Sequence, residues 1–177
     1  WGKILPQKIL SLIGSILVLI FSIIIFYLNQ EWGSIVLFAG NWRPPYGITF
    51  VTDTLSTVML LLTSIVGLAI SIYSNAAVSH SRIKFGYFPI FHFLLMGLSG
   101  TFLTGDIFNM YVWFEIVIIS SFVLLTLGGK RMQMEGAVKY MAMNMLASII
   151  FLTAIGILYG ITGSLNIADI GMKVRNI

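Results

Sequence analysis

The chain has 177 residues, of which 58% are hydrophobic and 9% are charged, and its mean hydropathy is +0.99. Soluble domains carry about 25% charged residues, so this composition excludes an ordinary soluble protein and indicates several membrane spans. The net charge is +4, but the basic residues lie in short loops rather than in a polar, aromatic-rich segment, so we expect no nucleic-acid partner. There is no cysteine, which excludes disulfides and thiolate metal sites within this chain.

The apolar runs predict an all-α polytopic membrane protein that forms a single membrane domain over residues 1–177. In chain order, the five expected spans cover roughly residues 9–28, 54–75, 86–104, 107–127 and 134–161, with Asp53 and Asp106 as the expected N-caps of the second and fourth spans. Residues 29–53 link the first two spans, and two short β-prone runs there flank Asn41–Gly47, where two prolines forbid a helix. We therefore expect an extracytoplasmic loop that resembles a β-hairpin. After the last span, residues 163–170 are expected to leave the membrane as a short interfacial helix.

The loop charges predict the orientation in the membrane. Six basic residues fall on the side of the N-terminus, namely Lys3, Lys8, Arg82, Lys84, Lys130 and Arg131. The opposite side carries three basic and three acidic residues, namely Arg43, Lys173, Arg175, Glu31, Asp106 and Asp169. Because basic residues accumulate in cytoplasmic loops, we expect a plasma-membrane protein with a cytoplasmic N-terminus and an extracytoplasmic C-terminus.

Glu115 lies near the middle of the fourth expected span. A central acid costs about 2.5–3.5 kcal/mol on insertion scales, and such residues usually mark ion or proton routes. At 1.5 Å per residue, Glu115 lies on the order of 13 Å below the extracytoplasmic end of its span, whereas Lys139 lies only on the order of 7 Å deep from the cytoplasmic side. We therefore expect no direct salt bridge between them, so that Glu115 is either protonated at rest or paired with a cation elsewhere.

Lys139 and His92 are further candidates for proton transfer, each with a structural alternative. Lys139 either belongs to a polar path or simply extends to the cytoplasmic interface. His92 lies on the order of 9 Å into the third span, close to the level of Lys139, so its imidazole could relay protons. The alternative for His92 is a hydrogen-bonded structural histidine. With two histidines and no cysteine in the chain, we expect neither a metal site nor a cofactor.

Four stretches of the sequence resemble one known family. They are Gly40–Ser56, Phe102–Glu115, Val138–Asn144 and Tyr159–Asp169. Together they resemble the antiporter-like membrane subunits shared by Mrp-type multisubunit Na⁺/H⁺ antiporters, respiratory complex I and membrane-bound hydrogenases, with the D-type subunits of Mrp antiporters as the most similar branch. The match is collinear over essentially the whole chain, and its most specific part is the stretch Gly-Asp-Ile-Phe-Asn…Phe-Glu that ends at Glu115.

The resemblance implies that the five spans correspond to family helices 2 to 6. Glu115 would then be the glutamate of helix 5, which in the family pairs with a lysine of helix 7 in a proton-translocating polar axis. Lys139 would occupy the helix-6 position where many members carry a lysine, whereas His92 matches no family-wide pattern. Because family members are much longer, the sequence is expected to be an N-terminal-half fragment that lacks the helix-7 lysine.

These observations predict a proton-translocating, antiporter-like subunit of a multisubunit Na⁺/H⁺ antiporter, that is, a transporter subunit and not an enzyme. It is expected to carry protons and Na⁺ and to assemble with other membrane subunits in the lipid bilayer. Two alternatives stay open. One is a proton-pumping subunit of a redox complex, such as complex I or a membrane-bound hydrogenase, and the other is a non-transporting scaffold subunit.

Overall fold

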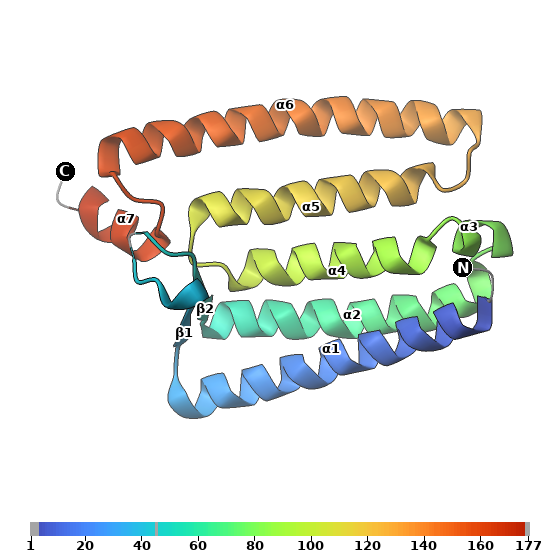
Figure 1. The fold of residues 1–177 in the computed structure, drawn as a ribbon, viewed down its shortest axis with the longest axis horizontal. Helices are drawn as coiled ribbons and strands as arrows, with labels where there is room; N and C mark the ends of the chain where they lie inside the picture. The colour runs from blue at the N-terminus through green and yellow to red at the C-terminus, as the bar shows by residue number, and fades with distance from the viewer. Residues whose placement is uncertain (1–3, 45, 176–177) are drawn as a thin grey trace.

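A computed structural model describes residues 4–44 and 46–175, and each expected span coincides with a long α-helix (Figure 1). These helices are α1 (Ile4–Trp32), α2 (Thr54–Ala77), α4 (Tyr87–Leu103), α5 (Ile107–Thr126) and α6 (Arg131–Thr162). The smaller elements are β1 (Ile35–Phe38), a 3-10 turn (Ala39–Asn41), β2 (Thr49–Thr52), α3 (His80–Lys84) and α7 (Ile167–Val174). The predicted fold class, a helical polytopic protein with one small hairpin, is thereby confirmed.

Among the described residues, α1, α2, α5 and α6 are long and apolar enough to cross a membrane, and α4 is an apolar helix of 17 residues. That length is at the short end of the range for a spanning helix. The loop expected between the second and third spans contains the short helix α3, which the apolar pattern did not predict. Its last turn carries Arg82 and Lys84, and cations at that position are favourable because they face the negative end of the helix dipole.

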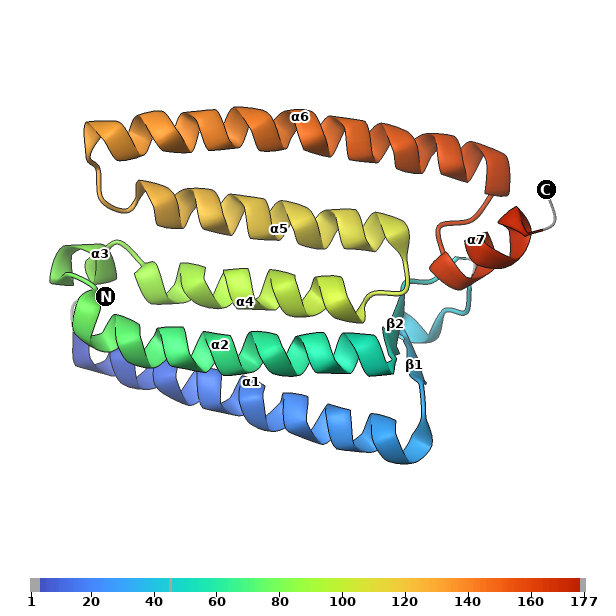
Figure 2. The same cartoon turned by 180° about the vertical axis from the view of Figure 1, so that it is seen from behind.

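The long helices lie side by side, and α6, α5, α4 and α2 follow one another in both views (Figures 1 and 2). α1 packs chiefly against α2, and α4 is held between α2 and α5. The loops sort onto two ends of this bundle. The α3 end carries α3 and the α5–α6 loop, whereas the hairpin end carries β1, β2, the α4–α5 turn and α7 (Figure 1).

Small polar residues, not large apolar ones, occupy the seam between α1 and α2. The buried residues of α1 are Ser11, Ser15, Ser22 and Asn29, while many of its leucines and isoleucines face outward. The Ser22 and Ser64 hydroxyl oxygens are 2.6 Å apart across this seam. Small hydroxyl residues allow close helix approach in a membrane, where lipid tails solvate the apolar exterior. The burial pattern therefore fits a bundle in lipid and not a soluble core.

The hairpin end is fixed by β-pairing and by helix caps. β1 and β2 pair antiparallel, with Ile35 opposite Thr52 and Phe38 opposite Thr49. The chain then turns directly into α2, where Asp53 is the N-cap predicted from the sequence. Its carboxylate accepts a 2.7 Å hydrogen bond from the Ser56 backbone N–H, and the Ser56 hydroxyl accepts a 2.8 Å bond from the Asp53 backbone N–H. This reciprocal pair is a capping box, which satisfies two donors at the start of the helix.

Removing this cap should destabilise the bundle measurably. The hydrogen bonds from the Ser56 backbone and side chain hold the pKa of Asp53 below its usual range. The cap therefore contributes fully above the ordinary carboxyl pKa and is lost as the pH falls through the lowered value in the folded protein. We expect Asp53→Ala to reduce stability by about 1 kcal/mol, measured as a lower thermal unfolding midpoint in detergent. Asp53→Asn should retain most of the cap and lose its acid sensitivity, and equal losses in both variants would contradict this account.

Candidate functional site

α5, which carries Glu115, packs tightly against α4 through two glycines. A Cβ at Gly100 would lie 2.2 Å from Cδ2 of Trp113, and a Cβ at Gly97 would lie 2.8 Å from Cγ2 of Val117. Both distances are shorter than van der Waals contact, so the absence of a side chain at these positions is what allows the Trp113 face of α5 to approach α4. The N-terminus of α5 is capped by Asp106, as predicted, through a 2.7 Å bond from the Asn109 backbone N–H.

A different face of α5 packs against α6 through aromatic and hydroxyl side chains. The rings of Phe114 and Phe151 meet edge to face with centroids 5.9 Å apart, and those of Tyr111 and Phe151 are 6.2 Å apart. Nearer the α3 end, the Ser121 and Tyr140 hydroxyl oxygens are 3.0 Å apart. These contacts, together with those to α4, fix the rotation of α5 about its own axis.

Glu115 consequently points away from α4. With 3.6 residues per turn, it lies roughly 160° around the helix from Trp113 and roughly 40° from Tyr111. It is therefore on the side of α5 that α6 partly covers, and its side chain is half-buried. Tyr111, one turn earlier on the same side, is its polar neighbour.

No basic side chain reaches Glu115 from within residues 4–44 and 46–175. The two ion pairs of this part of the chain, Lys139–Glu135 and Lys173–Asp169, each have a nitrogen–oxygen distance of 2.9 Å. Neither includes Glu115, which agrees with the depth estimate made from the sequence. The structure thus presents a half-buried carboxyl near the middle of a spanning helix without a counter-charge of its own.

Lys139 faces away from Glu115. Its side chain is 74% exposed in this chain and pairs with Glu135 one turn earlier on α6. Sequence reasoning did not identify Glu135 as this partner, although the i,i+4 spacing of an acid followed by a lysine is a recognisable signal.

His92 lies on the α1 side of α4. Its Nε2 is 3.0 Å from the Ser11 hydroxyl oxygen and 3.2 Å from the Ser11 carbonyl oxygen. His92 and Lys139 are therefore not neighbours, although they lie at similar depth, because α5 separates their helices (Figure 1).

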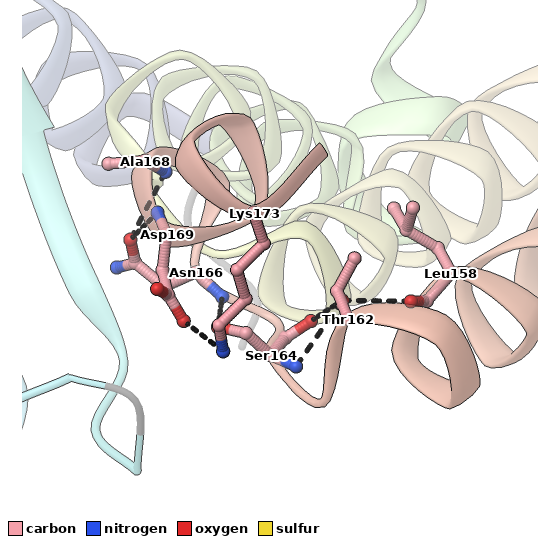
Figure 3. Close-up of polar contacts among 7 residues, drawn as sticks. All are labelled: Leu158, Thr162, Ser164, Asn166, Ala168, Asp169 and Lys173. Carbon is pink, nitrogen blue, oxygen red and sulfur yellow. Dashed lines mark hydrogen bonds and ion pairs between the residues drawn. The ribbon is translucent and has the colours of Figure 1, made fainter. Parts of the chain in front are cut away.

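A buried polar network at the hairpin end joins the α6–α7 loop to the hairpin, and Figure 3 shows the part of it that lies between α6 and α7. The Asn166 side chain caps α7 by accepting bonds of 3.1 and 3.2 Å from the backbone N–H groups of Ala168 and Asp169. Its amide nitrogen donates a 3.0 Å bond to the Thr49 hydroxyl of β2. Hydrogen bonds from the Ser164 hydroxyl and from Lys173 hold the pKa of Asp169 below its usual range. Sequence reasoning did not identify Asn166, although an asparagine directly before a helix is an N-cap signal.

Backbone hydrogen bonds tie the same region together. The Gly105 N–H donates to the Thr49 carbonyl at 2.8 Å, and the Ile167 N–H donates to the Gly105 carbonyl at 3.0 Å. The Ile107 N–H donates to the Leu165 carbonyl at 2.9 Å. β2, the α4–α5 turn and the α6–α7 loop are thereby cross-linked. This network holds the start of α5, and with it the position of Glu115.

Asn166→Ala should weaken this network more than an ordinary cap deletion. The substitution removes both the α7 cap and the buried bond to Thr49, so we expect a loss of about 1–3 kcal/mol, measured by thermal unfolding in detergent. Asn166→Asp is the matched control, because it keeps the capping oxygen and replaces the amide donor with a carboxylate oxygen in a side chain of the same shape. If both variants unfolded like the unmodified protein, the network would contribute nothing to stability.

The candidate residues do not gather around a metal centre in the part of the chain that the structure describes. Residues 4–44 and 46–175 contain no cluster of three or more His, Asp or Glu side chains suited to a metal ion. A cavity of about 670 Å³ lies at the hairpin end between β2, α2, α4 and α7, and its lining is mainly apolar. The candidate functional residues therefore lie along the helices, not in a single pocket.

Comparisons with known proteins show which family this chain is similar to. The family model described as NADH:quinone oxidoreductase/Mrp antiporter, TM, matches residues 104–177. The D-type subunit of the Na⁺/H⁺ antiporter of Alkalihalophilus pseudofirmus is 40% identical over 171 residues, which cover 95% of this chain and 34% of that protein. The chain thus spans about a third of the length of this relative.

Two solved structures share the arrangement of helices. The archaeal membrane-bound sulfane sulfur reductase, a respiratory membrane complex, contains a chain with a TM-score of 0.89 and 30% identity over 93% of this chain and 34% of its own length. The Mrp complex from Dietzia sp. DQ12-45-1b contains one with a TM-score of 0.88 and 26% identity over 95% of this chain and 32% of its own length.

Proposed function

We propose that this chain, which belongs to the family of antiporter-like membrane subunits found in Mrp antiporters and NADH:quinone oxidoreductases, carries protons in a multisubunit Na⁺/H⁺ antiporter. The similarity to the D-type subunit of an Na⁺/H⁺ antiporter over 95% of the chain supports this choice within the family. Its partners are other membrane subunits, and its transported ions are H⁺ and Na⁺. The basic residues at the α3 end support a cytoplasmic location for that end.

Glu115 is the proposed switching group, and the observation that carries this role is its position. It is a half-buried acid in the middle of α5, and no basic side chain contacts it in the described chain. An acid in apolar surroundings favours its protonated form, whereas a nearby cation favours the ionised form. A cation that approaches Glu115 in the assembled protein would therefore release its proton, and withdrawal of that cation would let a proton bind.

Lys139 and His92 are the other proposed proton-transfer groups. Lys139 lies about two turns from the α3 end of α6 and pairs with Glu135 at 2.9 Å. An acid–lysine pair at that depth can exchange protons with the cytoplasmic surface while keeping its net charge balanced. His92 lies in a separate part of the bundle, on the α1 side of α4, so it would serve a route other than the one past Lys139.

The second candidate function is proton pumping in a redox complex. The family model includes NADH:quinone oxidoreductase subunits, and the sulfane sulfur reductase complex contains a chain of the same fold. In that case Glu115 would perform the same protonation cycle, driven by a redox partner instead of a sodium gradient. Copurification of redox subunits with this chain, and proton movement that depends on a reductant, would favour this function over antiport.

Proton transport in everted membrane vesicles tests the proposal. Vesicles that contain the assembled complex with Glu115→Gln should fail to dissipate an imposed pH gradient when Na⁺ is added. An assembled Glu115→Gln complex that still transports at the normal rate would contradict the proposal and favour a scaffold role.

A further inference from the structure

His92 is the one residue shared by two cavities that lie on opposite sides of it along the bundle. A cavity of about 410 Å³ on the side of the α3 end is lined by Gln7, Ser11, Phe88 and His92, among others. A cavity of about 460 Å³ on the side of the hairpin end extends from His92 past Ser99 and Trp113 to Phe50 of β2. The His92 side chain therefore lies at the boundary between the two cavities.

The contacts of the His92 ring leave one nitrogen free to bind a proton. Nε2 lies 3.2 Å from the Ser11 carbonyl oxygen, and a carbonyl can only accept, so the neutral ring carries its hydrogen on Nε2. Nδ1 is then the acceptor that remains. The ring is also fixed in place, because a Cβ at Gly14 would come within 3.1 Å of Cε1 of His92. The Ser11 hydroxyl, 3.0 Å from Nε2, continues to the Ser71 hydroxyl at 3.4 Å.

The hairpin-side cavity offers polar groups to water molecules. The indole N–H of Trp113 is buried without a hydrogen-bond partner in the described chain, and the Ser22 and Ser99 side chains line the same cavity. Trp113 packs against Gly100, roughly 12 Å along α4 from His92, so a chain of several water molecules would be needed to link the indole to the His92 ring through this mainly apolar cavity. Because Trp113 is two residues from Glu115, this cavity reaches the depth of Glu115 on the opposite side of α5.

Some titratable groups on the elements that pack against His92 lie toward the α3 end, whereas Tyr27 and Glu31 of α1 lie near the hairpin end and Tyr111 and Glu115 lie in the hairpin-side half of α5. On α1, the Lys8 ammonium donates to the Asn75 carbonyl oxygen of α2. On α4, the Tyr87 hydroxyl is 2.7 Å from the Ser74 hydroxyl of α2. Arg82 and Lys84 lie in the last turn of α3, and α5 contributes Trp113 to the cavity wall. The imidazole is therefore the titratable group placed at the junction itself.

We propose that His92 is a proton-binding site between the two cavities and forms, with Ser11 and Ser71, a proton route through α1, α2 and α4 that is separate from Glu115. A proton from cavity water binds Nδ1 and gives the imidazolium. The proton on Nε2 then passes to the Ser11 hydroxyl oxygen while that hydroxyl gives its own proton to water in the α3-side cavity, which Ser11 also lines. The ring is then neutral with its hydrogen on Nδ1, and it returns to the Nε2 tautomer before the next proton binds. The proposal rests on the proposed proton transport, but its site and its test are independent of Glu115.

The first test measures transport by the assembled complex in everted vesicles as a function of pH. His92→Gln should lower the rate roughly a hundredfold, the lower end of the range for losing a proton-transfer group, and should flatten its dependence on pH between about 5 and 8. Ser11→Ala removes the hydroxyl while keeping the carbonyl contact, so it should lower the rate less but shift the pH profile. His80→Gln is the matched control, since His80 is exposed at the start of α3, and it should leave both the rate and the profile unchanged.

The second test follows the protonation of the unmodified His92 ring directly. Nitrogen-15 NMR of histidine-labelled complex in lipid, with His92→Gln to assign the signal, should show that the His92 ring gains and loses a proton between about pH 5 and pH 8. A ring that stays neutral throughout this range, or an assembled His92→Gln complex with normal rate and pH profile, would overturn the proposal. If Glu115→Gln leaves transport intact, the proposed switch fails, but the titration of His92 still decides this inference.

Discussion

Glu115→Gln is expected to abolish coupled proton transport while leaving the fold intact. Glutamine has almost the same size and shape as glutamate, so the packing of α5 between α4 and α6 is preserved. Its amide, however, does not take up or release a proton as the pH changes. The loss of a proton-transfer group typically costs 10²–10⁴-fold in rate, so we expect the rate to fall by at least roughly a hundredfold. The measurement is the decay of a pH gradient in everted vesicles after addition of Na⁺, with complex assembly checked on a native gel.

Two control variants distinguish the loss of a proton-transfer group at Glu115 from a general effect of removing one negative charge. Glu115→Asp keeps the carboxyl and should retain part of the activity, because only its reach is shortened. Glu31→Gln makes the same chemical change at an exposed position near the end of α1, and it should transport at the normal rate. If Glu115→Gln assembled fully and transported like Glu31→Gln, Glu115 would have no role in the proton route.

The helices and the hairpin were predictable because they depend on local patterns. Long apolar runs separated by polar loops predict the spanning helices, and prolines between two β-prone runs predict the hairpin. The caps at Asp53 and Asp106 follow from an acidic residue placed directly before an apolar run. Each of these signals lies within a few residues of the element it defines, so a single sequence contains it in full.

The lateral relations between helices were not predictable in the same way. Depth along the membrane normal follows from residue count, and it correctly indicated that Glu115 and Lys139 form no ion pair with each other. Position around the bundle depends instead on which helix packs beside which, and α5 separates His92 on α4 from Lys139 on α6. His92 and Lys139 lie at similar depth, which suggested that they are neighbours, but the order in which the helices pack keeps them apart.

Much of the sequence that resembles the family forms the hairpin end of the bundle. Three of the four matching stretches include Thr49, Gly105 or Asn166, and these residues are joined by the hydrogen bonds described above. A single sequence gives no sign that segments so far apart meet, because each bond links residues separated by dozens of positions. Their shared role is to hold the hairpin and the starts of α5 and α7 together at one end of the bundle.

Packing glycines show the same limit of sequence reasoning. Gly156 and Gly160 have the spacing typical of close helix contacts, yet a Cβ at either position would meet no atom within 4 Å in the described chain. Gly97 and Gly100, which share no such spacing, are the glycines of the tight contact between α4 and α5. The identity of the neighbouring helix, and not the local sequence, decides which glycine is required.

Gly100→Ala is therefore expected to damage both stability and transport. The new Cβ would lie 2.2, 2.4 and 2.6 Å from three carbons of the Trp113 ring system, so either the indole must rotate or α5 must move away from α4. Overpacking of this kind costs roughly 1–3 kcal/mol, and a displacement of α5 would carry Glu115 with it. We expect a lower thermal unfolding midpoint in detergent and a reduced rate of gradient decay in vesicles, because Glu115 no longer lies where its partner approaches.

Gly156→Ala is the matched control for this substitution. It makes the same change within α6, where the added methyl group would meet nothing within 4 Å in the described chain. Alanine is favoured over glycine within a helix by about 1 kcal/mol, so this variant should be as stable as the unmodified protein or more so, with normal transport. A normal unfolding midpoint and a normal rate for Gly100→Ala as well would mean that the contact between α4 and α5 can relax, and that the position of Glu115 does not depend on the Gly100–Trp113 fit.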